Sequence, residues 1–379
     1  MAKESPKISL LLTGGGARAA YQVGVLKAIA EWYPRVHHSP FSIYCGTSAG
    51  AINAISIASY ASCFRLGVKK LEWIWSRLHS RKIFATSPLG MSGYLAGQWY
   101  ARLQSSHHER PPFGLLNNRP LRQLLNQVNN YQRLEKQIVA GNLHGIAITA
   151  SSYKSGQSVS FFQGQPTVAE WDLAKSKGRR TLLTTDHLLA SAAIPLVFPA
   201  TRIGQAYYGD GSIHQLAPLR PSLKMGADKI LIIDLINQKQ EETDYTRAPG
   251  LAALGGHLMD TIFSDTLAAD LENLSRTNSL LMDLPASIRK KRELRHIEHI
   301  HLSPSQSFEP LAQRYYNHLP PMTRALMRLT GISPKDDSSI TSYILFEPAY
   351  IQALIQMGYE DTQEKEVILR KFLNKSLHY

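Results

Sequence analysis

Short apolar runs alternate with segments of helical periodicity in the N-terminal part of the chain. Buried strands are expected at two such runs, residues 8–12 and residues 41–45. A helix is expected after each, because apolar side chains recur at helical spacing over residues 19–32 and small residues continue to Ala58. This order of elements is typical of a parallel sheet with helices on both faces. Right-handed crossovers then bring the loops after both strands to the carboxyl edge of the sheet, where such folds bind ligands.

The remaining pattern divides the chain into two parts. Further strands are expected at three apolar runs, residues 145–150, 159–162 and 229–235. A hairpin loop is expected at residues 154–157, and the polar segment 237–246 is the expected boundary. The residues beyond it are mostly helical in pattern, with one strand-like alternation at 296–302. We therefore expect a domain over residues 5–237 and a mostly helical C-terminal extension, packed on it, over residues 238–379.

Three segments have more than one interpretation. Residues 66–78 predict a basic helix whose apolar side packs on the core, with contact to a membrane as the alternative. Residues 105–120 predict an irregular connection that is a candidate mobile cover. The densest basic run, residues 289–292, is interpreted as a solvated helix end or, alternatively, as a contact with a membrane surface.

Composition narrows the class of protein. With 379 residues, 44% of them hydrophobic and 19% charged, the chain is typical of a globular protein. No signal-peptide core and no membrane-spanning run is evident. The two cysteines cannot form a disulfide framework, and Cys45, in an expected strand, predicts a buried and inert thiol. These features favour a cytoplasmic protein. The net charge of +13 favours peripheral contact with the anionic inner face of a membrane, and no nucleic-acid motif accompanies it.

A candidate nucleophile lies between the second strand and its helix. Residues 46–50 read Gly-Thr-Ser-Ala-Gly, a Gly-x-Ser-x-Gly pattern in which small neighbours allow a sharp turn that exposes the oxygen of Ser48. The following helix N-terminus would favour negative charge on that oxygen. Strand, turn and helix provide the context that this chemistry requires. An ordinary helix-start turn is the alternative.

The glycine loop after the first strand has two interpretations. Gly14, Gly15 and Gly16, followed by Ala19, fit a dinucleotide-binding fingerprint, but that site needs an acidic residue at the end of the second strand, and none is present. The hydrolase interpretation explains the glycines directly, because N–H groups without side chains can approach an oxyanion closely. The loss of one such donor typically costs about 3–4 kcal/mol of transition-state stabilisation.

A serine nucleophile needs a base. Asp210 lies between two glycines just after a short apolar run, an arrangement that aims a carboxylate without crowding. An ordinary Asp-Gly turn is the alternative for this residue. His214, four residues later, is the one histidine that we consider as a third member of a triad.

Four blocks together resemble the patatin-like phospholipases, serine acyl hydrolases with a Ser–Asp dyad. The glycine loop 14–19 matches their Gly-Gly-Gly-x-Arg/Lys-Gly pattern, with Ala19 as the last residue, and residues 46–50 match their serine elbow. Residues 190–198 match an intermediate Ala-Ser-x-x-x-Pro-x-x-Phe-like block, and Asp210-Gly211 matches their Asp-Gly-Gly/Ala motif, with Ser212 in third place. The blocks occur in the family's order and cover about residues 7–235.

The resemblance implies a fold, a reaction and a set of site residues. The fold is a three-layer α/β/α fold with a mainly parallel central sheet, and the C-terminal part is similar to the helical extension of some bacterial members. Ser48 would attack an acyl ester while Asp210 takes its proton directly. N–H groups of the oxyanion loop, Gly14, Gly15 and Gly16, and of Ala49 would hold the oxyanion. Arg18 would either brace the loop or bind a phosphate or carboxylate of the substrate. No cofactor is implied.

The other conspicuous polar residues predict structural roles. His296, His299 and His301 alternate across a short strand, so they do not converge on one metal ion, and we expect no metal site. Asp186 predicts a helix N-cap, and Asp234 an acid at a strand end.

Three functions fit these residues to different degrees. The leading hypothesis is a lipid acyl hydrolase that cleaves phospholipids or related esters through an acyl-enzyme. An acyltransferase or thioesterase would use the same dyad. A catalytically idle lipid-binding protein is a third hypothesis, which the intact Ser48, Asp210 and glycine loop make less favourable.

Overall fold

The computed structural model describes most of the chain. Described are residues 5–33, 38–87, 112–237, 251–285, 295–329 and 339–374, together with 90, 92–94, 96–98, 100, 287 and 288. Parts of three expected features lie outside these residues: residues 105–111 of the irregular connection, residues 238–246 of the boundary segment, and the basic run 289–292.

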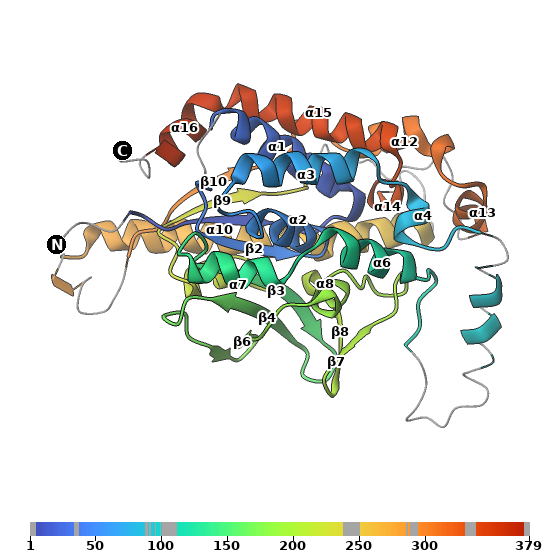
Figure 1. The fold of residues 1–379 in the computed structure, drawn as a ribbon, viewed down its shortest axis with the longest axis horizontal. Helices are drawn as coiled ribbons and strands as arrows, with labels where there is room; N and C mark the ends of the chain where they lie inside the picture. The colour runs from blue at the N-terminus through green and yellow to red at the C-terminus, as the bar shows by residue number, and fades with distance from the viewer. Residues whose placement is uncertain are drawn as a thin grey trace.

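One mixed sheet lies at the centre of the molecule (Figure 1). Its described strands are β1 (Ile8–Leu12), β2 (Ile43–Thr47), β3 (Gly145–Ser152), β4 (Gln157–Gly164), β5 (Trp171–Leu173), β6 (Ser176–Arg180), β7 (Thr201–Ile203), β8 (Ala206–Asp210), β9 (Lys229–Ile233) and β10 (Glu298–Leu302). The order is β10-β9-β1-β2-β3-β4-β6-β5, and the pairs from β10 to β3 are all parallel. β3 and β4 form an antiparallel hairpin. β8 pairs with β3 at residues 150–152, past the last residue of β3 that pairs with β2, and β7 pairs with β8.

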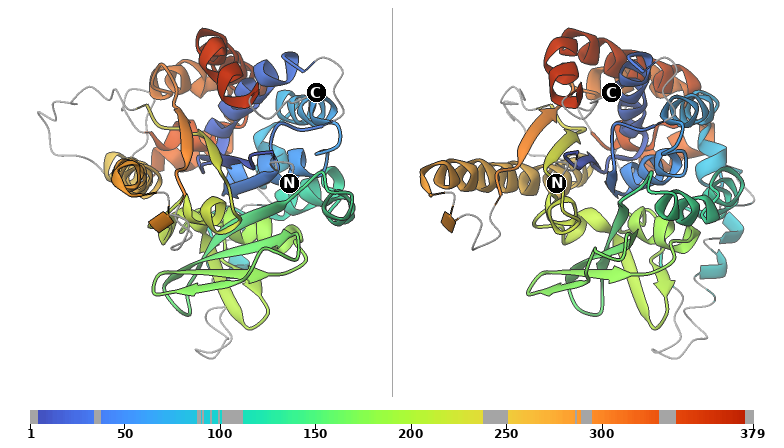
Figure 2. Two further views of the ribbon diagram at one scale, coloured as in Figure 1. Left: turned by 90° about the vertical axis from the view of Figure 1, so that its left-hand side faces the viewer. Right: turned by 60° about the vertical axis from the view of Figure 1, so that its left-hand side comes forward.

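Helices cover both faces of this sheet, because successive strand residues point to opposite sides. Leu10 and Leu12 belong to one core, with side chains of α1 (Ala20–Glu31), α2 (Ala49–Ala58), α3 (Phe64–Ser76) and α15 (Pro348–Glu364). Leu11 belongs to a second core, with side chains that include Leu267 and Leu274 of α10 (Leu251–Asp283) and the residues around α9 (Arg220–Lys224). The predicted three-layer α/β/α fold with a mainly parallel sheet is therefore confirmed. Figure 2 shows β4, β6 and β7 on the side of the molecule away from α15.

The remaining helices are mostly short. They include η1 (Gly16–Ala19), α4 (Ser80–Ile83), α6 (Arg119–Val128), α7 (Gln132–Val139), α8 (Thr185–Ser191), η2 (Gly211–Ile213), α12 (Glu309–Tyr315), η3 (Tyr316–His318), α13 (Pro321–Leu329), α14 (Ile340–Ile344) and α16 (Glu366–Asn374). Among the helices described, none combines the length and the apolar character needed to cross a bilayer.

Described elements beyond residue 250 extend the same core and sheet. β10 adds a parallel edge strand to β9, and α15 lies along α1 (Figure 1). The α1–α15 contact is backbone to backbone: a Cβ on Gly24 would lie 1.9 Å from the carbonyl oxygen of Ile355, and a Cβ on Gly358 would lie 2.1 Å from that of Tyr21. The Tyr21 hydroxyl also donates to Asp361 at 2.8 Å. The extension thus contributes both a strand and a helical layer.

Several local predictions can be compared with the structure residue by residue. The strand predicted at 41–45 is β2, and it begins and ends two residues later, so it leads straight into Ser48. The helix at 66–78 is α3, whose apolar side packs on the core as predicted. Cys45 is buried, which raises the pKa of its thiol to about 11.

The prediction for Asp186 is wrong. α8 is capped by Thr184, whose backbone N–H donates to His187 Nδ1 at 3.1 Å in a capping box, and Asp186 lies in the first turn. His187 thus takes the place of the Glu or Gln usual at the third helical position. Asp234 follows β9, as predicted, and accepts hydrogen bonds from Thr13 and Leu235.

Candidate functional site

Ser48 occupies a strained turn between β2 and α2. Its φ of 55° and ψ of −127° are rare for a residue with a side chain, and such strain clusters at functional sites. The turn requires glycine on both sides. A Cβ on Gly46 would lie 2.6 Å from the Cα of Ala51, and a Cβ on Gly50 would lie 2.4 Å from the carbonyl oxygens of Leu12 and Thr13. The sequence therefore folds locally into the sharp strand–serine–helix turn that the Gly-x-Ser-x-Gly pattern predicts.

Asp210 lies at the end of β8 and is fully buried. Its Oδ1 accepts a hydrogen bond from the backbone N–H of Ser212 at 3.0 Å, and its Oδ2 has no full hydrogen bond within the described chain. Burial raises the pKa of this carboxyl from its ordinary 3.8 to about 6, whereas the neighbouring Ser48 hydroxyl and Ser212 act to lower the pKa. The structure thus brings together the two residues that the sequence singled out as nucleophile and base.

The glycine loop approaches the same serine from β1. Gly16 has a φ of 54° and lines a cavity together with Ser48 and Ala49. The N–H groups of Gly15, Gly16 and Ala49 make no hydrogen bond to other described residues. Ala49 is also the first residue of α2, where the helix dipole favours negative charge. Gly14 differs from these residues, because it lines a second cavity with Thr47 and Ser212.

Ser191, to which the sequence analysis gives no role, holds the turn. Its Oγ accepts a hydrogen bond from the backbone N–H of Ser48 at 2.9 Å and donates one to the carbonyl oxygen of Thr149 at 2.6 Å. Two residues later, the carbonyl oxygen of Ala193 accepts a hydrogen bond from the N–H of Asp210 at 2.9 Å. The block 190–198 therefore positions both Ser48 and Asp210. Its match to a family motif was the only signal in the sequence.

An apolar cavity opens beside Ser48. The apolar side of α3 forms one wall, and the other walls come from α2, α4, α6, the 192–198 segment and α14. Its lining includes Ile52, Leu71, Ile74, Trp75, Leu78, Ile83, Leu121, Leu124, Leu125, Val128, Ile194, Phe198, Tyr343, Ile344 and Phe346. Such a lining suits a hydrocarbon chain.

Arg18 points into the C-terminal part of the chain and is 3% exposed. Its guanidinium donates to Ser342 Oγ at 2.7 Å and to the Tyr343 hydroxyl at 3.1 Å, and it forms an ion pair with Glu309. It also stacks on the Tyr343 ring, 3.9 Å from the ring centre. These contacts favour the bracing alternative over binding of a substrate anion.

The histidines are separate from this centre. The ring of His214 makes no hydrogen bond to Ser48 or Asp210, and its Nδ1 is buried without a partner in the described chain. His301 Nε2 contacts Asp234 Oδ2 at 3.1 Å. No group of three metal-ligating side chains is found within the described residues.

The comparisons with known proteins identify the family. Residues 10–223 match the family described as patatin-like phospholipase. The match covers more than half of the chain, so the chain belongs to the patatin-like phospholipase family, and this membership supports a hydrolase that acts on lipids.

A curated relative, a cGAMP-activated phospholipase of Pseudomonas aeruginosa (strain BWHPSA011 / Pa011), is 26% identical over 209 residues. The match covers 55% of this chain and 53% of the relative, so the chain spans about half the length of the relative that it matches.

Similar solved structures share little sequence with this chain. Human GIVD cytosolic phospholipase A2, in complex with methyl gamma-linolenyl fluorophosphonate inhibitor and terbium chloride, has a TM-score of 0.47 and 12% identity, covering 98% of this chain and 59% of that chain. VipD from Legionella pneumophila has a TM-score of 0.39 and 12% identity, covering 95% and 66%.

Proposed function

We propose that this chain is a serine acyl hydrolase that cleaves acyl esters of phospholipids or related lipids through Ser48 and Asp210. One observation carries the proposal: the strained Ser48 turn faces a fully buried Asp210 and opens onto an apolar cavity. Nucleophile, base and a compartment for a hydrocarbon chain then meet at one point.

The reaction follows from this arrangement. Asp210, largely ionised at neutral pH, accepts the proton of the Ser48 hydroxyl while Oγ attacks the ester carbonyl. The oxyanion that forms is held by N–H groups of Gly15, Gly16 and Ala49. The C–O bond to the alcohol then breaks, the alcohol takes the proton from Asp210, and an acyl-enzyme remains. Water then attacks the acyl carbonyl with Asp210 again as base. The bond to Ser48 Oγ breaks, Oγ takes the proton from Asp210, and the fatty acid is released.

The cavity indicates the acyl part of the substrate. Because its lining is almost entirely apolar, each methylene of an acyl chain moved into it from water gains about 0.8 kcal/mol. A long acyl chain is therefore favoured over a short one.

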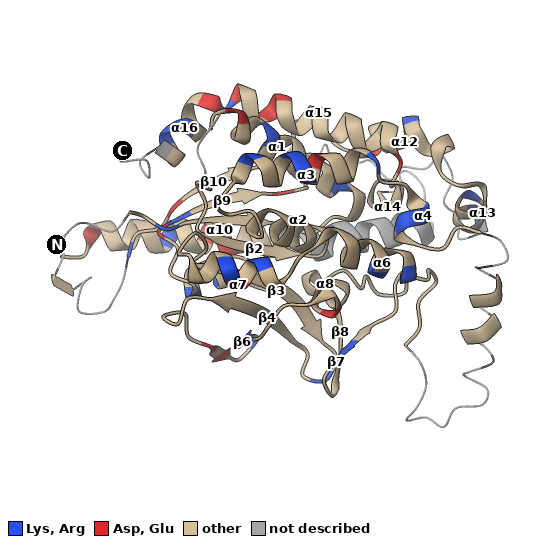
Figure 3. Cartoon of the chain, in the orientation of Figure 1, with Lys and Arg blue, Asp and Glu red and all other residues tan. Residues whose placement is uncertain are grey.

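The surface near the cavity suits an anionic membrane. Leu196 is 69% exposed, with a positive φ of 66°, and lies between the cavity residues Ile194 and Phe198. Exposed Arg81 and Lys82 lie on α4, and the exposed Arg119 begins α6, two helices that also line the cavity (Figure 3). An exposed apolar side chain and exposed cations, all on elements that line one cavity, are suited to a surface with anionic head groups. We propose that the protein acts there from the cytoplasm.

The division into a hydrolase domain at 5–237 and an extension at 238–379 is part of this proposal. The match to the family over residues 10–223 supports the first part. The packing of α15 on α1 and of β10 on β9 supports an extension that folds onto the domain.

A test needs purified protein, a p-nitrophenyl ester and a fluorophosphonate probe. The wild type is expected to release p-nitrophenol and to gain one probe adduct on Ser48. Ser48→Ala and Asp210→Asn are expected to lose the hydrolysis, and His214→Ala, the control, to retain it. Loss in His214→Ala with full activity in Asp210→Asn would contradict the dyad. Products formed with a competing alcohol distinguish transfer from hydrolysis.

A further inference from the structure

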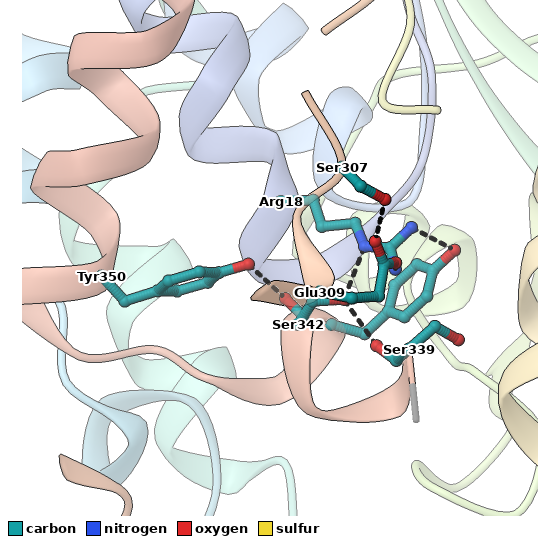
Figure 4. A network of polar contacts seen from close by, with 7 residues as sticks. Arg18, Ser307, Glu309, Ser339, Ser342 and Tyr350 are labelled. Carbon is teal, nitrogen blue, oxygen red and sulfur yellow. Dashed lines mark hydrogen bonds and ion pairs between the residues drawn. The ribbon is translucent and has the colours of Figure 1, made fainter. Parts of the chain in front are cut away.

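Arg18 joins the glycine loop to a turn of the chain more than 300 residues later. It belongs to η1, the 3₁₀ turn that starts at Gly16, and its guanidinium binds Ser342 and Tyr343 of α14. Glu309, the first residue of α12, completes the group as the ion-pair partner of Arg18, and Ser307 donates a hydrogen bond to Glu309 (Figure 4). The side chains of Arg18 and Glu309 are 3% and 18% exposed, so the loss of either one removes an ion-pair contact from a largely buried charge.

The same turn lies against the loop backbone. The carbonyl oxygen of Tyr343 is so close to Gly16 that a Cβ there would be only 2.3 Å away. Gly16 has a positive φ, which a change in its backbone neighbours is expected to disturb. α14 therefore limits the position of Gly16 from one side while Arg18, two residues further on, is held by the same turn.

α14 also belongs to the cavity. Tyr343, Ile344 and the nearby Phe346 line it together with side chains of α3 and α6. One short helix thus has three roles. It lines the cavity, its backbone packs against Gly16, and its side chains bind Arg18.

We propose that α14, joined to the glycine loop through Arg18, whose guanidinium is also held by Glu309, is a positioning element that fixes the N–H groups of Gly15 and Gly16 for the oxyanion. Arg18 is then a positioning residue that acts through the loop and not a ligand of the substrate phosphate. The inference rests on the proposed function, in which these N–H groups stabilise the transition state.

Two substrates separate the two roles of Arg18. A neutral p-nitrophenyl ester carries no phosphate, and phosphatidylglycerol vesicles present one. Arg18→Gln and Glu309→Gln are expected to lower kcat about 10- to 100-fold on both substrates, with KM changed little, because small displacements of catalytic groups carry penalties of this size. Tyr343→Phe keeps the ring and loses one hydrogen bond, so its kcat is expected to fall only about 2- to 10-fold.

Tyr21→Phe is the matched control. It removes a buried hydrogen bond, to Asp361, that also joins the N-terminal part to the extension but does not involve the glycine loop. Its melting temperature is expected to fall while its kcat is retained. If Glu309→Gln behaves like Tyr21→Phe, or if Arg18→Gln loses only the turnover of phosphatidylglycerol, the inference is wrong.

Hydrogen exchange gives a measurement that does not depend on catalysis. Glu309→Gln is expected to increase deuterium uptake in the peptide that contains Gly15 and Gly16, while Tyr21→Phe leaves it unchanged. Equal uptake in wild type and Glu309→Gln would overturn the inference even if no substrate were hydrolysed. Absence of hydrolysis in the wild type together with increased uptake would contradict only the proposed function.

Discussion

Ser191 Oγ accepts a hydrogen bond from the Ser48 backbone N–H at 2.9 Å, and it donates one to the carbonyl oxygen of Thr149 at 2.6 Å. The next residue of β3, Ala150, pairs with Asp210 in the register of the sheet. The serine turn and the buried carboxylate are therefore both held by adjacent residues of β3, Thr149 and Ala150. This explains how two residues so far apart in the sequence keep a fixed relative position.

Ser191→Ala is expected to lower both activity and stability. It leaves the N–H of Ser48 and the carbonyl of Thr149 without their buried partner, which costs about 1–3 kcal/mol of unfolding free energy. Loosening the serine turn is expected to lower kcat about 10- to 100-fold. Chemical denaturation and ester hydrolysis measure the two effects. Ser160→Ala is the control, because Ser160 is equally buried and its hydroxyl also bonds to Thr149, through the side chain at 3.1 Å. Equal kcat in the two variants would refute this role.

Gly16→Ala is expected to inactivate the protein. Its Cβ would lie 2.3 Å from the Tyr343 carbonyl oxygen, and its φ of 54° is unfavourable for alanine. Gly156→Ala provides the control, because Gly156 has a φ of 60° and nothing lies within 4 Å of the added Cβ. It is expected to lose about 1 kcal/mol of stability and no activity. A melting curve and the hydrolysis rate of each variant are sufficient, and an active Gly16→Ala would count against the close contact.

The rate is expected to fall on the acidic side with the titration of Asp210. Burial raises the pKa of this carboxyl to about 6, and the base must be ionised to accept the proton of Ser48. The kcat/KM of a neutral ester should therefore be level above that pH and fall about tenfold per unit below it. Circular dichroism at each pH controls for unfolding. A profile that stays level down to pH 4 would exclude Asp210 as the base.

Asp210→Asn is expected to stabilise the protein at neutral pH. The pKa in the folded chain is raised above its ordinary value of 3.8, so ionisation of Asp210 opposes folding: the penalty is absent below that value, grows between the two values and is complete above about 6. Relief of this penalty is expected to add up to about 3 kcal/mol at pH 8 and nothing at pH 3.

Asp234→Asn is the matched control for that measurement. The Asp234 carboxylate is also buried, but it accepts hydrogen bonds from Thr13 and Leu235, so its replacement is expected to destabilise. Denaturant unfolding of both variants and wild type at the two pH values compares them. A destabilised Asp210→Asn at pH 8 would contradict the prediction, because it would mean that contacts in the folded protein outweigh the cost of burying the ionised Asp210.

The sequence predicted the features that depend on neighbouring residues. The Ser48 turn needs an apolar strand, two glycines and a helix within a few positions, and all are visible in the chain. Asp210 was marked by its glycines and by the resemblance to a family. The two-residue shift of β2 is of the kind that apolar content alone does not resolve, because the adjoining residues are also buried.

Features that depend on distant residues were not predicted. The partner of Arg18, Glu309, is 291 residues away, and no local pattern indicates it. Ser191 resembles any small helical residue until the fold brings it beneath Ser48. The cap of α8 was missed for a different reason: a histidine fills the position where glutamate or glutamine is usual, so Thr184 did not stand out.

The contact between Gly16 and Tyr343 has a consequence for biosynthesis. A ribosome makes the glycine loop first, and the segment that backs the loop and lines the cavity follows more than 300 residues later. Chains that end before this segment therefore lack one wall of the apolar cavity. The order of residues in the chain is thus expected to delay the proposed activity until α14 has been made.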